Sequence, residues 1–599
     1  MSFEMTPERE AYFRARGRVI LNACPGSGKT TCLVHKLMDL LKECHAANGA
    51  YAGIACLSFT NKAKDEIQNK YKAVTGESLH YPHTASTIDR FINQFITLPF
   101  FNLLNREFGR PKIIDNADII EQSLTVSFQG RNGTLQKMLR PPFNRFKNKD
   151  DTALYRSYPP GDIWIELGGS FSFAGKQPNP DKVEPAVFQA YGKALFDWKV
   201  KNGLITSLDS AYLGLKILTD NPKIGQWLIK RFPVIIIDEA QDNSAVQHAL
   251  FDKLLAYGHS HIELIGDPYQ SLYEWRDAKP LLFLDKYHGQ GWFALPLSQN
   301  RRSTQRIIDC FSIVRLATDE QITSKDVTDL QIPVTIYRYH ASNASHIVAD
   351  FERICGLHGF TQNQIVVRGN ELKDQMLGTS ASIEPWKHHT PVQLLTIKSL
   401  FDSQHIKEAI DELRKLIAQL SSPDYHVQRE NLTTYKEDYS YNARLYKLLL
   451  DLPGLDLSLE AWSQRAEALL GAFYANLGES FLFKQRITGY VMRELRQRPA
   501  KDFFHRSSSH NANIPISTVH QVKGATLDAL LYFFDESSRG TSVSFNDFKP
   551  SVSFPTEKQR IIYVACSRPR QFLAMAFPSR VTPAEIQATF GQQVLISSI

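Results

Sequence analysis

The sequence predicts an α/β protein with two doubly wound parallel-sheet cores, each interrupted by an inserted segment. The first basis is two groups of short, continuous apolar runs, one before residue 280 and the other after residue 330. Such runs are typical of parallel strands that helices cover on both faces. The second basis is a long stretch of different composition within each group. The length of 599 residues allows roughly four domains of ordinary size.

The first core is expected from apolar runs in the first half of the chain. These runs are residues 19–21, 53–59, 234–237 and 262–265. A glycine-rich turn follows the first run, and apolar residues between 33 and 41 then recur at helical spacing. Residues 100–203 are instead rich in Pro, Asn and Gly and lack strand periodicity. We therefore assign residues 1–99 and 204–280 to the first core and residues 100–203 to its insertion.

The second core is expected from a later group of similar runs. These are residues 334–339, 365–367, 514–519, 529–534 and 572–577. Between them, segments such as 406–420 and 461–477 have the spacing of helices. We therefore assign residues 281–379 and 511–599 to the second core and residues 380–510 to its insertion.

Composition narrows the class of protein without identifying its partner. The net charge of +7, from 69 basic and 62 acidic residues, is compatible with a polyanionic partner. No apolar run is long enough to span a membrane, and the polar N-terminus does not resemble a signal peptide. The 7 cysteines include no Cys-x-x-Cys pair, which disfavours a zinc site or a disulfide framework. We expect a cytoplasmic protein with reduced thiols and no membrane partner.

The turn after the first apolar run has the residues of a phosphate-binding loop. Residues 23–30 read ACPGSGKT and lie between a strand and a helix, which is the context that this loop requires. Lys29 would reach the β- and γ-phosphates, and the Thr30 hydroxyl would bind Mg²⁺. A chance glycine-rich turn is the alternative, and Ala23 stands where the general pattern has Gly. The candidate nucleotide-binding residues here are Ala23, Cys24, Pro25, Gly26, Ser27, Gly28, Lys29, Thr30 and Thr31.

A second candidate segment follows another apolar strand. Residues 235–242 read IIIDEAQD, so adjacent carboxylates stand at the end of the strand. Asp238 is suited to hold Mg²⁺, directly or through water, and Glu239 can polarise the attacking water as general base. Adjacent acids after a strand are also common as helix N-caps. The phosphate-binding loop upstream favours the catalytic interpretation.

The acidic segment and five further blocks, in this order, resemble the UvrD/Rep-like superfamily 1 DNA helicases. The further blocks, which resemble motifs Ia, III, IV, V and VI, are LSFTNKA (57–63), GDPYQSLYEWR (266–276), LSQNRRS (297–303), TVHQVKG (518–524) and YVACSR (563–568). Each block alone is moderately specific, whereas six in order are very specific. The resemblance covers both cores and says little about residues 100–203 or 380–510.

This resemblance implies two RecA-like cores with ATP and Mg²⁺ between them, each core carrying a mainly helical inserted subdomain. It implies ATP hydrolysis coupled to 3′–5′ movement on single-stranded DNA. Gln270 would sense the γ-phosphate, and Arg302 and Arg568 would act as arginine fingers, although a surface salt bridge is the usual role of an arginine. Arg301 and Gly524 would also contact the nucleotide.

Aromatic side chains near motif III are candidates for DNA binding, because unpaired bases stack on aromatic rings. The candidate DNA-binding residues are Phe59, Asn61, Tyr273, Trp275, Arg276 and His520. A place in the protein core is the alternative for Trp275. Residues 131–149 contain six cations, no acid, and the interleaved Phe143 and Phe146, so they are either a phosphate-contacting patch or a solvated charged face.

The positions that would read the base and sugar depart from the family pattern. Arg9 or Glu10 stands where the family usually has a Gln for the adenine edge, and Arg301 stands where it usually has a Tyr. Thr526 replaces a Glu that is often near the ribose. We expect weaker selection between ATP and other purine triphosphates, unless a polar side chain such as Asn22 or Asn300 reads the adenine.

Three functions remain open from the sequence. The first is an ATP-dependent DNA helicase or translocase acting on single-stranded or tailed double-stranded DNA. The second is a DNA-sensing ATPase that regulates a separate nuclease subunit in DNA repair or anti-phage defence, as in systems such as Gabija. The short distance between motif VI and residue 599 leads us to expect no fused nuclease. The third, a catalytically silent scaffold, is disfavoured by the intact acids and arginines.

Overall fold

The computed structural model describes most of the chain as two compact units. The larger unit comprises Met1–Ala341, Ile354–Val366 and Val519–Ile599, and the smaller comprises Ser342–Arg353 and Val367–Thr518. The described residues are 4–107, 109–114, 124–129, 135–139, 143–274, 277–340, 343–368, 386, 390–402, 405–421, 432, 438–473, 496–503, 514–535 and 542–597. None of the helices in these ranges is long and apolar enough to cross a membrane.

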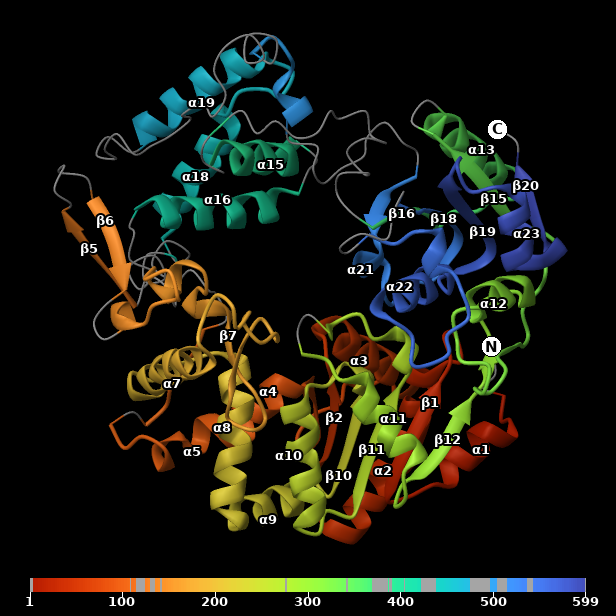
Figure 1. The fold of residues 1–599 in the computed structure, drawn as a ribbon, viewed down its shortest axis with the longest axis horizontal. Coiled ribbons are helices and arrows are strands. Elements are labelled where there is room, and N and C mark those ends of the chain that lie inside the picture. The colour runs from red at the N-terminus through yellow and green to blue at the C-terminus, as the bar shows by residue number, and fades with distance from the viewer. Residues whose placement is uncertain are drawn as a thin grey trace. The chain divides into compact units, whose positions relative to one another are not determined.

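The first sheet of the larger unit is parallel, as the apolar runs predict. Its strand order is β12-β1-β11-β10-β2-β3, and Figure 1 shows β12, β1, β11, β10 and β2 side by side. The strands are β1 (Arg18–Ala23), β2 (Ile54–Ser58), β3 (Thr84–Thr87), β10 (Val234–Asp238), β11 (His261–Gly266) and β12 (Phe293–Leu297). Since all are parallel, the loops that leave β1, β10 and β11 emerge at the same edge.

Strand β12 corrects one predicted boundary. The sequence places residues 281–379 in the second core, but β12 pairs in parallel with β1, Val19 opposite Phe293 and Ala23 opposite Leu297. Helix α11 (Pro280–His288) likewise buries Phe283 in the hydrophobic cluster that includes the first sheet. The first core therefore continues past residue 280. Pro296 conceals the strand, because a proline within an apolar run argues against a strand inside a sheet.

Alternating residues of the first sheet enter two separate clusters. Val19 and Leu21 pack with apolar residues of α2 (Lys29–Asn48) and α3 (Asn61–Thr75). Ile20 faces the other cluster, to which the opposite set of helices contributes. Those helices are α8 (Ser207–Asp220), α9 (Pro222–Arg231), α10 (Ala245–Ala256) and α11. Burial of both faces explains why these strands read as continuous apolar runs.

The second sheet accounts for four of the later apolar runs. In the larger unit its strand order is β16-β18-β19-β15-β20, with the β15–β19, β15–β20 and β18–β19 pairs parallel. The strands are β15 (Val334–Tyr339), β16 (Asn363–Val367), β18 (Leu527–Phe533), β19 (Pro569–Pro578) and β20 (Val594–Ser597). Helices α12 (Gln305–Ser312), α22 (Glu557–Cys566) and α23 (Pro583–Phe590) share its hydrophobic cluster. The fold is therefore mixed α/β with parallel sheets.

The described part of the first insertion is not mainly helical, contrary to expectation. It contains α7 (Pro185–Lys201) and two antiparallel strand pairs. The pairs are β5 (Thr125–Gln129) with β6 (Leu135–Leu139), and β7 (Ile163–Ile165) with β8 (Phe171–Phe173). The β7–β8 strands are too short to show a period of two in the sequence, which explains the error. An aromatic cluster that includes Phe143, Phe188 and Tyr191 forms the core of this region.

Helices dominate the described part of the smaller unit. They are α15 (Thr390–Asp402), α16 (Ile406–Ser421), α18 (Tyr439–Asp451) and α19 (Leu459–Phe473). Their apolar faces meet around the buried side chains of Trp386 and Trp462. The helices predicted at 406–420 and 461–477 correspond to α16 and α19.

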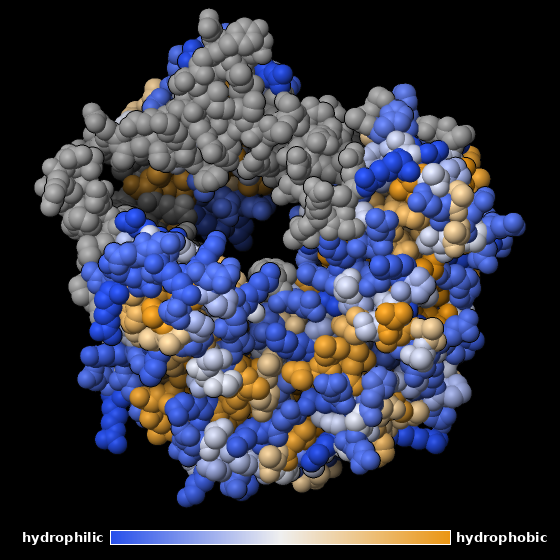
Figure 2. Space-filling model, viewed as in Figure 1, coloured by the Kyte–Doolittle hydropathy of each residue, from blue (hydrophilic) through white to orange (hydrophobic). Residues whose placement is uncertain are grey.

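On the outer surface, Figure 2 shows apolar residues interspersed with hydrophilic ones over the larger unit, which is ordinary for a globular protein.

A buried charge network fixes α2 against the first sheet. The Lys36 ammonium lies 2.6 Å from a carboxylate oxygen of Glu263 on β11, and both residues are fully buried. Tyr12 donates a hydrogen bond of 2.9 Å to the same carboxylate, and the His261 ring lies 2.7 Å from it. Burial raises the pKa of Glu263, but Lys36 and His261 lower it below its ordinary value overall.

We expect Lys36→Met to destabilise the protein by about 3–5 kcal/mol, because the substitution leaves the Glu263 carboxylate buried without its main counter-charge. The measurement is urea unfolding followed by circular dichroism. Lys216→Met is the control, since Lys216 forms an exposed pair with Asp220 on α8, worth about 0–1 kcal/mol. Equal unfolding midpoints for the two variants would contradict the assignment.

Candidate functional site

The phosphate-binding loop connects the end of β1 to the start of α2. Gly28 caps the helix with a left-handed backbone (φ 80°), and Gly26 is also left-handed (φ 71°). A Cβ atom at Gly26 would lie 2.6 Å from the Cβ of Arg302 and 2.8 Å from the side-chain oxygen of Asn300. Glycine is therefore required at position 26 by both backbone conformation and space.

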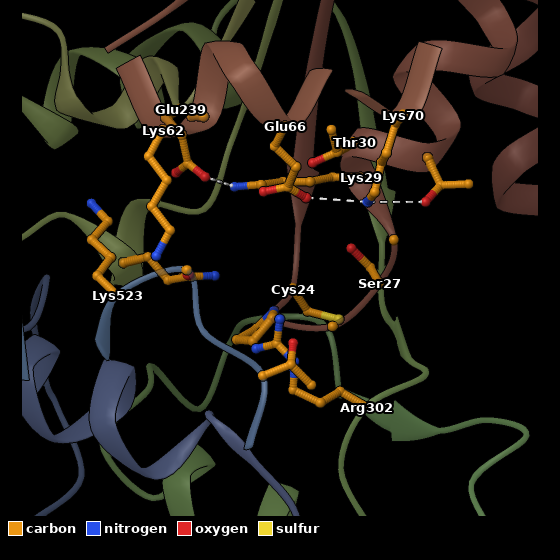
Figure 3. A pocket seen from close by; sticks show the side chains of 18 of the residues that line it. Cys24, Ser27, Lys29, Thr30, Lys62, Glu66, Lys70, Glu239, Arg302 and Lys523 are labelled. Carbon is orange, nitrogen blue, oxygen red and sulfur yellow. Dashed lines mark hydrogen bonds and ion pairs between the residues drawn. The ribbon is translucent and has the colours of Figure 1, made fainter. Parts of the chain in front are cut away.

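A cavity of about 850 Å³ lies in front of this loop, a volume ordinary for a small-molecule site. Figure 3 shows the Lys29 side chain directed toward Glu239, with Arg302 on the side of Cys24. Predicted nucleotide-site residues that line the cavity are Cys24, Pro25, Gly26, Ser27, Gly28, Lys29, Thr30, Thr31, Glu239, Gln270, Arg301, Arg302, Gly524 and Arg568. Ala23 and Asp238 lie just behind them, as the last residues of β1 and β10.

Lys29 and Glu239 form an ion pair inside the cavity. Gln241 donates a hydrogen bond to the other carboxylate oxygen of Glu239, and Glu239 has a left-handed backbone (φ 56°), which is uncommon for a non-glycine residue. Burial would raise the pKa of Glu239, but Lys29, and after it Lys523, hold it below its ordinary value. Glu239 is therefore a carboxylate at neutral pH, as a general base must be.

The oxygen donors expected for Mg²⁺ fit that ion. Asp238 is buried at the end of β10, and one of its carboxylate oxygens accepts the Glu239 backbone N–H at 3.0 Å. Burial raises the pKa of Asp238 to about 7, and Lys29 only partly offsets this effect. A divalent cation would reverse the effect by favouring the carboxylate form. Thr30, at the start of α2, adds a hydroxyl of the kind that Mg²⁺ binds beside phosphates.

Both predicted arginine fingers, Arg302 and Arg568, line the cavity, as does Gln270 from the segment that follows β11. Arg568 donates a hydrogen bond of 2.7 Å to the side-chain oxygen of Gln270, whose amide group donates to Asp267 at 2.8 Å. Arg302 donates to the backbone carbonyl of Ser567 at 3.2 Å. Burial, then the neighbouring Arg568 charge, lowers the pKa of Arg302 to about 9. Buried, mutually repelling guanidinium groups are suited to bind an anion.

Sequence reasoning missed the face of α3 that lines the cavity. Lys62, Glu66 and Lys70 recur every four residues on this helix and all line the cavity. The Lys70 ammonium lies 3.1 Å from Glu66 and donates to the Thr31 hydroxyl at 3.3 Å, as Figure 3 shows. The spacing of four was the available signal, since it places residues on one helical face. Lys523 was also missed.

The structure distinguishes among some of the residues that were predicted to contact the base or the sugar of the nucleotide. Arg9 is buried and lines the cavity, where it donates to the backbone carbonyls of Glu4 at 2.7 Å and Ser27 at 3.3 Å. Glu10 instead pairs with Arg14 at the surface, so Arg9 is the residue at this position. The Asn300 side-chain oxygen accepts the backbone N–H groups of residues 302 and 303, which gives it a structural role. Thr526 lines the cavity.

Arg301 carries two acidic neighbours at the cavity edge. Its guanidinium group pairs with Glu4 and with Asp326. The Arg301 side chain is about one-fifth exposed, at 19%. The planar group is therefore held by carboxylates on two sides, and a base would meet it in a fixed orientation.

Three predicted DNA-binding side chains, those of Phe59, Tyr273 and His520, lie together and line one part of the same cavity. The rings of Phe59 and Tyr273 are 5.1 Å apart, and those of Tyr273 and His520 are 6.4 Å apart. The Lys523 ammonium lies 4.4 Å from the centre of the Tyr273 ring and pairs with Asp242 at 2.6 Å. Asn61 is exposed at the start of α3. Trp275 and Arg276 lie outside the described residues.

The two aromatic residues of the basic stretch at residues 131–149 are excluded as DNA-binding side chains. Phe143 and Phe146 are buried in the core of the first insertion, so they do not stack on bases. Lys147 and Lys149 pair with Asp151 and Glu184. Arg131 and Arg140 lie outside the described residues.

Comparison with known proteins agrees with these motifs. The UvrD/REP helicase N-terminal domain family matches residues 5–289. The ATP-dependent DNA helicase PcrA of Bacillus subtilis is 27% identical over 308 residues, which are 50% of this chain and 38% of PcrA. DNA helicase II of Salmonella typhimurium is 25% identical over 427 residues, or 68% of this chain and 53% of that protein.

A relative with a different name matches a shorter region. This relative is one of the subunits of an ATP-dependent helicase/nuclease of Lactobacillus johnsonii. It is 32% identical over 199 residues, which are 30% of this chain and 16% of that protein. The chain thus spans about half the length, or less, of these curated relatives. Residues 5–289 thus match the UvrD/REP helicase N-terminal domain family, and the chain is similar to DNA helicases over a longer stretch.

Proposed function

We propose that the chain is an ATP-dependent DNA helicase or translocase that moves 3′–5′ along single-stranded DNA. The observation that carries the proposal is the convergence of Lys29, Glu239, Gln270, Arg302 and Arg568 on one cavity. These side chains are the set that phosphoryl transfer to water requires: a phosphate-binding cation, a base, a water-orienting amide and two arginines. Relatives named as DNA helicases, one of them as an ATP-dependent DNA helicase, support the same activity.

Hydrolysis begins with a change of partner for Lys29. In the nucleotide-free arrangement its ammonium neutralises Glu239. The β- and γ-phosphates of ATP would attract the same ammonium and so release the Glu239 carboxylate to polarise water. Thr30 and Asp238 would hold Mg²⁺, which supplies positive charge beside the phosphates when bound. Gln270, already oriented by Asp267, would position the attacking water.

Arg302 and Arg568 supply the charge that the transition state needs. Burial lowers the pKa of both guanidinium groups, so each gains from an anionic neighbour. The γ-phosphoryl oxygens accumulate charge in the transition state and would accept their hydrogen bonds. We assign the two sheets to two RecA-like cores, with the first extended past residue 280 to include β12. Residues 100–203 and 380–510 are the insertions.

The DNA track would run over the aromatic group that lines one part of the cavity. The Tyr273 ring lies tilted against those of Phe59 and His520, and a base that stacks on this group would gain roughly 1–3 kcal/mol. Asn61, Trp275 and Arg276 belong to the same predicted track. Because Lys523 contacts both Tyr273 and Asp242, the track is joined directly to the acidic segment of the ATP site.

A second candidate is a DNA-sensing ATPase that controls a separate nuclease. The similarity to the helicase/nuclease protein over 199 residues favours it. In this case ATP hydrolysis would still require DNA, but strand separation would not be its product. The two functions therefore differ in one measurable output.

The discriminating measurement is strand displacement with 3′-tailed, 5′-tailed and blunt duplexes, with ATP hydrolysis followed in parallel. We expect displacement of the 3′-tailed duplex alone, and ATP hydrolysis that rises with single-stranded DNA. DNA-stimulated hydrolysis without displacement or translocation would favour the nuclease-controlling ATPase instead. Hydrolysis indifferent to every DNA would contradict both functions.

Single substitutions should separate ATP binding from hydrolysis. Lys29→Ala should weaken nucleotide binding and abolish turnover, because it removes the cation that contacts the phosphates. Glu239→Gln should bind ATP but lower kcat by about 10²–10⁴-fold, since only the base is lost. Binding of a fluorescent ATP analogue and steady-state hydrolysis are the measurements. Near-normal DNA-stimulated hydrolysis by Glu239→Gln would remove Glu239 from the role of base.

We expect the chain to discriminate less between ATP and other purine triphosphates than a protein with a Gln–adenine contact does. Arg9 is engaged with backbone carbonyls, and the flat Arg301 group can stack on either purine ring. Loss of a bidentate amide contact costs roughly 1–3 kcal/mol of base discrimination. Hydrolysis of ATP, GTP and CTP with saturating single-stranded DNA tests this. A preference for ATP over GTP above about a hundredfold, or roughly 2.7 kcal/mol, would disprove it.

A further inference from the structure

Helix α22 contacts the segment after β11 at three positions along its length. Near the end of the helix, the Tyr563 hydroxyl donates to Asp267 at 3.2 Å. Two residues beyond the helix, Arg568 donates to Gln270. In its first turn, Arg560 reaches the part of the segment that carries the predicted DNA-binding aromatics. One helix therefore bears an arginine finger at one end and a contact to the DNA track at the other.

Arg560 is a buried cation held mainly by this segment. Only 1% of the residue is exposed, and its Nε donates to the backbone carbonyl of Ser271 at 2.8 Å. A terminal guanidinium nitrogen lies 2.7 Å from the Glu274 carboxylate, and the other donates to the Pro555 carbonyl at 2.5 Å. Ser271 and Glu274 lie on either side of Tyr273, so Arg560 contacts a backbone carbonyl before that aromatic residue and a side-chain carboxylate after it.

Glu274 is the exposed partner of this pair. Its side chain is 41% exposed, against 2% for Arg560, and its backbone carbonyl accepts the N–H of Asp277 at 3.0 Å. A base that stacks on Tyr273 would contact the residue next to Glu274 and so would shift or fix Glu274. Because an isolated buried guanidinium is unfavourable, Arg560 would follow Glu274 and Ser271 rather than lose its partners.

We propose that Glu274 and Arg560 form a positioning pair through which DNA on Tyr273 sets the placement of Arg568. The step from Arg560 to Arg568 spans about 12 Å of nearly continuous helix, which behaves as a rigid rod. Displacement of Glu274 therefore moves the arginine finger relative to Gln270. Neither Glu274 nor Arg560 lines the cavity, so the effect of the pair is on coupling. This inference rests on the proposed DNA-stimulated ATPase.

The test compares Glu274→Gln and Arg560→Lys with the unaltered chain. Steady-state kcat and KM for ATP are measured without DNA and with saturating oligo(dT), and oligo(dT) affinity is measured by fluorescence anisotropy. We expect the stimulated kcat to fall by about tenfold or more. Unstimulated kcat, KM and DNA affinity should stay within about twofold. The double variant should lose no more than the more affected single variant, because both remove one contact.

Matched controls separate coupling from folding. Glu585→Gln removes an exposed carboxylate that caps α23, and Arg338→Lys alters an arginine that donates to the backbone carbonyls of Ser579 and Val581; both should keep full stimulation. Glu274→Gln alters an exposed side chain, so it keeps the test decisive if Arg560→Lys folds poorly. Unchanged stimulation in Glu274→Gln, or equal loss of stimulated and unstimulated kcat, would overturn the inference. If the unaltered chain shows no DNA stimulation, the proposed function itself fails.

Discussion

The parallel pairing of β1, β10 and β11 is the constraint on which the site depends. Asn22 lies opposite Gly266, and Ile237 lies opposite Leu264, so the three strands end almost level. The phosphate-binding loop, the acidic segment and the segment with Gln270 therefore leave the sheet side by side, although more than 200 residues separate the first from the second. A shift of register in β1 or β10 would separate Lys29 from Glu239, because Glu239 directly follows β10 and Lys29 begins the helix that the loop joins to β1.

Charge balance is the second constraint. The cavity collects cations from several elements, and several of them contact an acid or a polar side chain of the protein. Lys29 pairs with Glu239, Lys523 with Asp242, and Arg568 with Gln270. Because these partners are protein groups with less charge than a triphosphate, exchange of partners is favourable when the nucleotide enters. We therefore expect nucleotide binding and the rearrangement of these side chains to occur together.

The sequence predicted the parts of this arrangement that depend on local chemistry. Buried parallel strands read as apolar runs, and the loop and acid motifs have fixed spacing, so β1, β10 and the residues around Lys29 and Asp238 could be placed. Strand β12 could not, because Pro296 within its short apolar run argues against a strand. The contacts of Arg560 and the cavity face of α3 could not be foreseen either. They depend on which helix face meets another segment, and one sequence does not specify tertiary contact.

The close approach at Gly26 implies that a substitution there would impair the site without unfolding the protein. A Cβ atom at position 26 would lie only 2.6 Å from the Cβ of Arg302, so even an alanine there would push the loop away from the segment that carries Arg302. The sheets and their hydrophobic clusters lie away from this point, so the polypeptide would still fold. Under the proposed function, such a variant would bind DNA without moving along it and would compete with the unaltered protein for the same DNA.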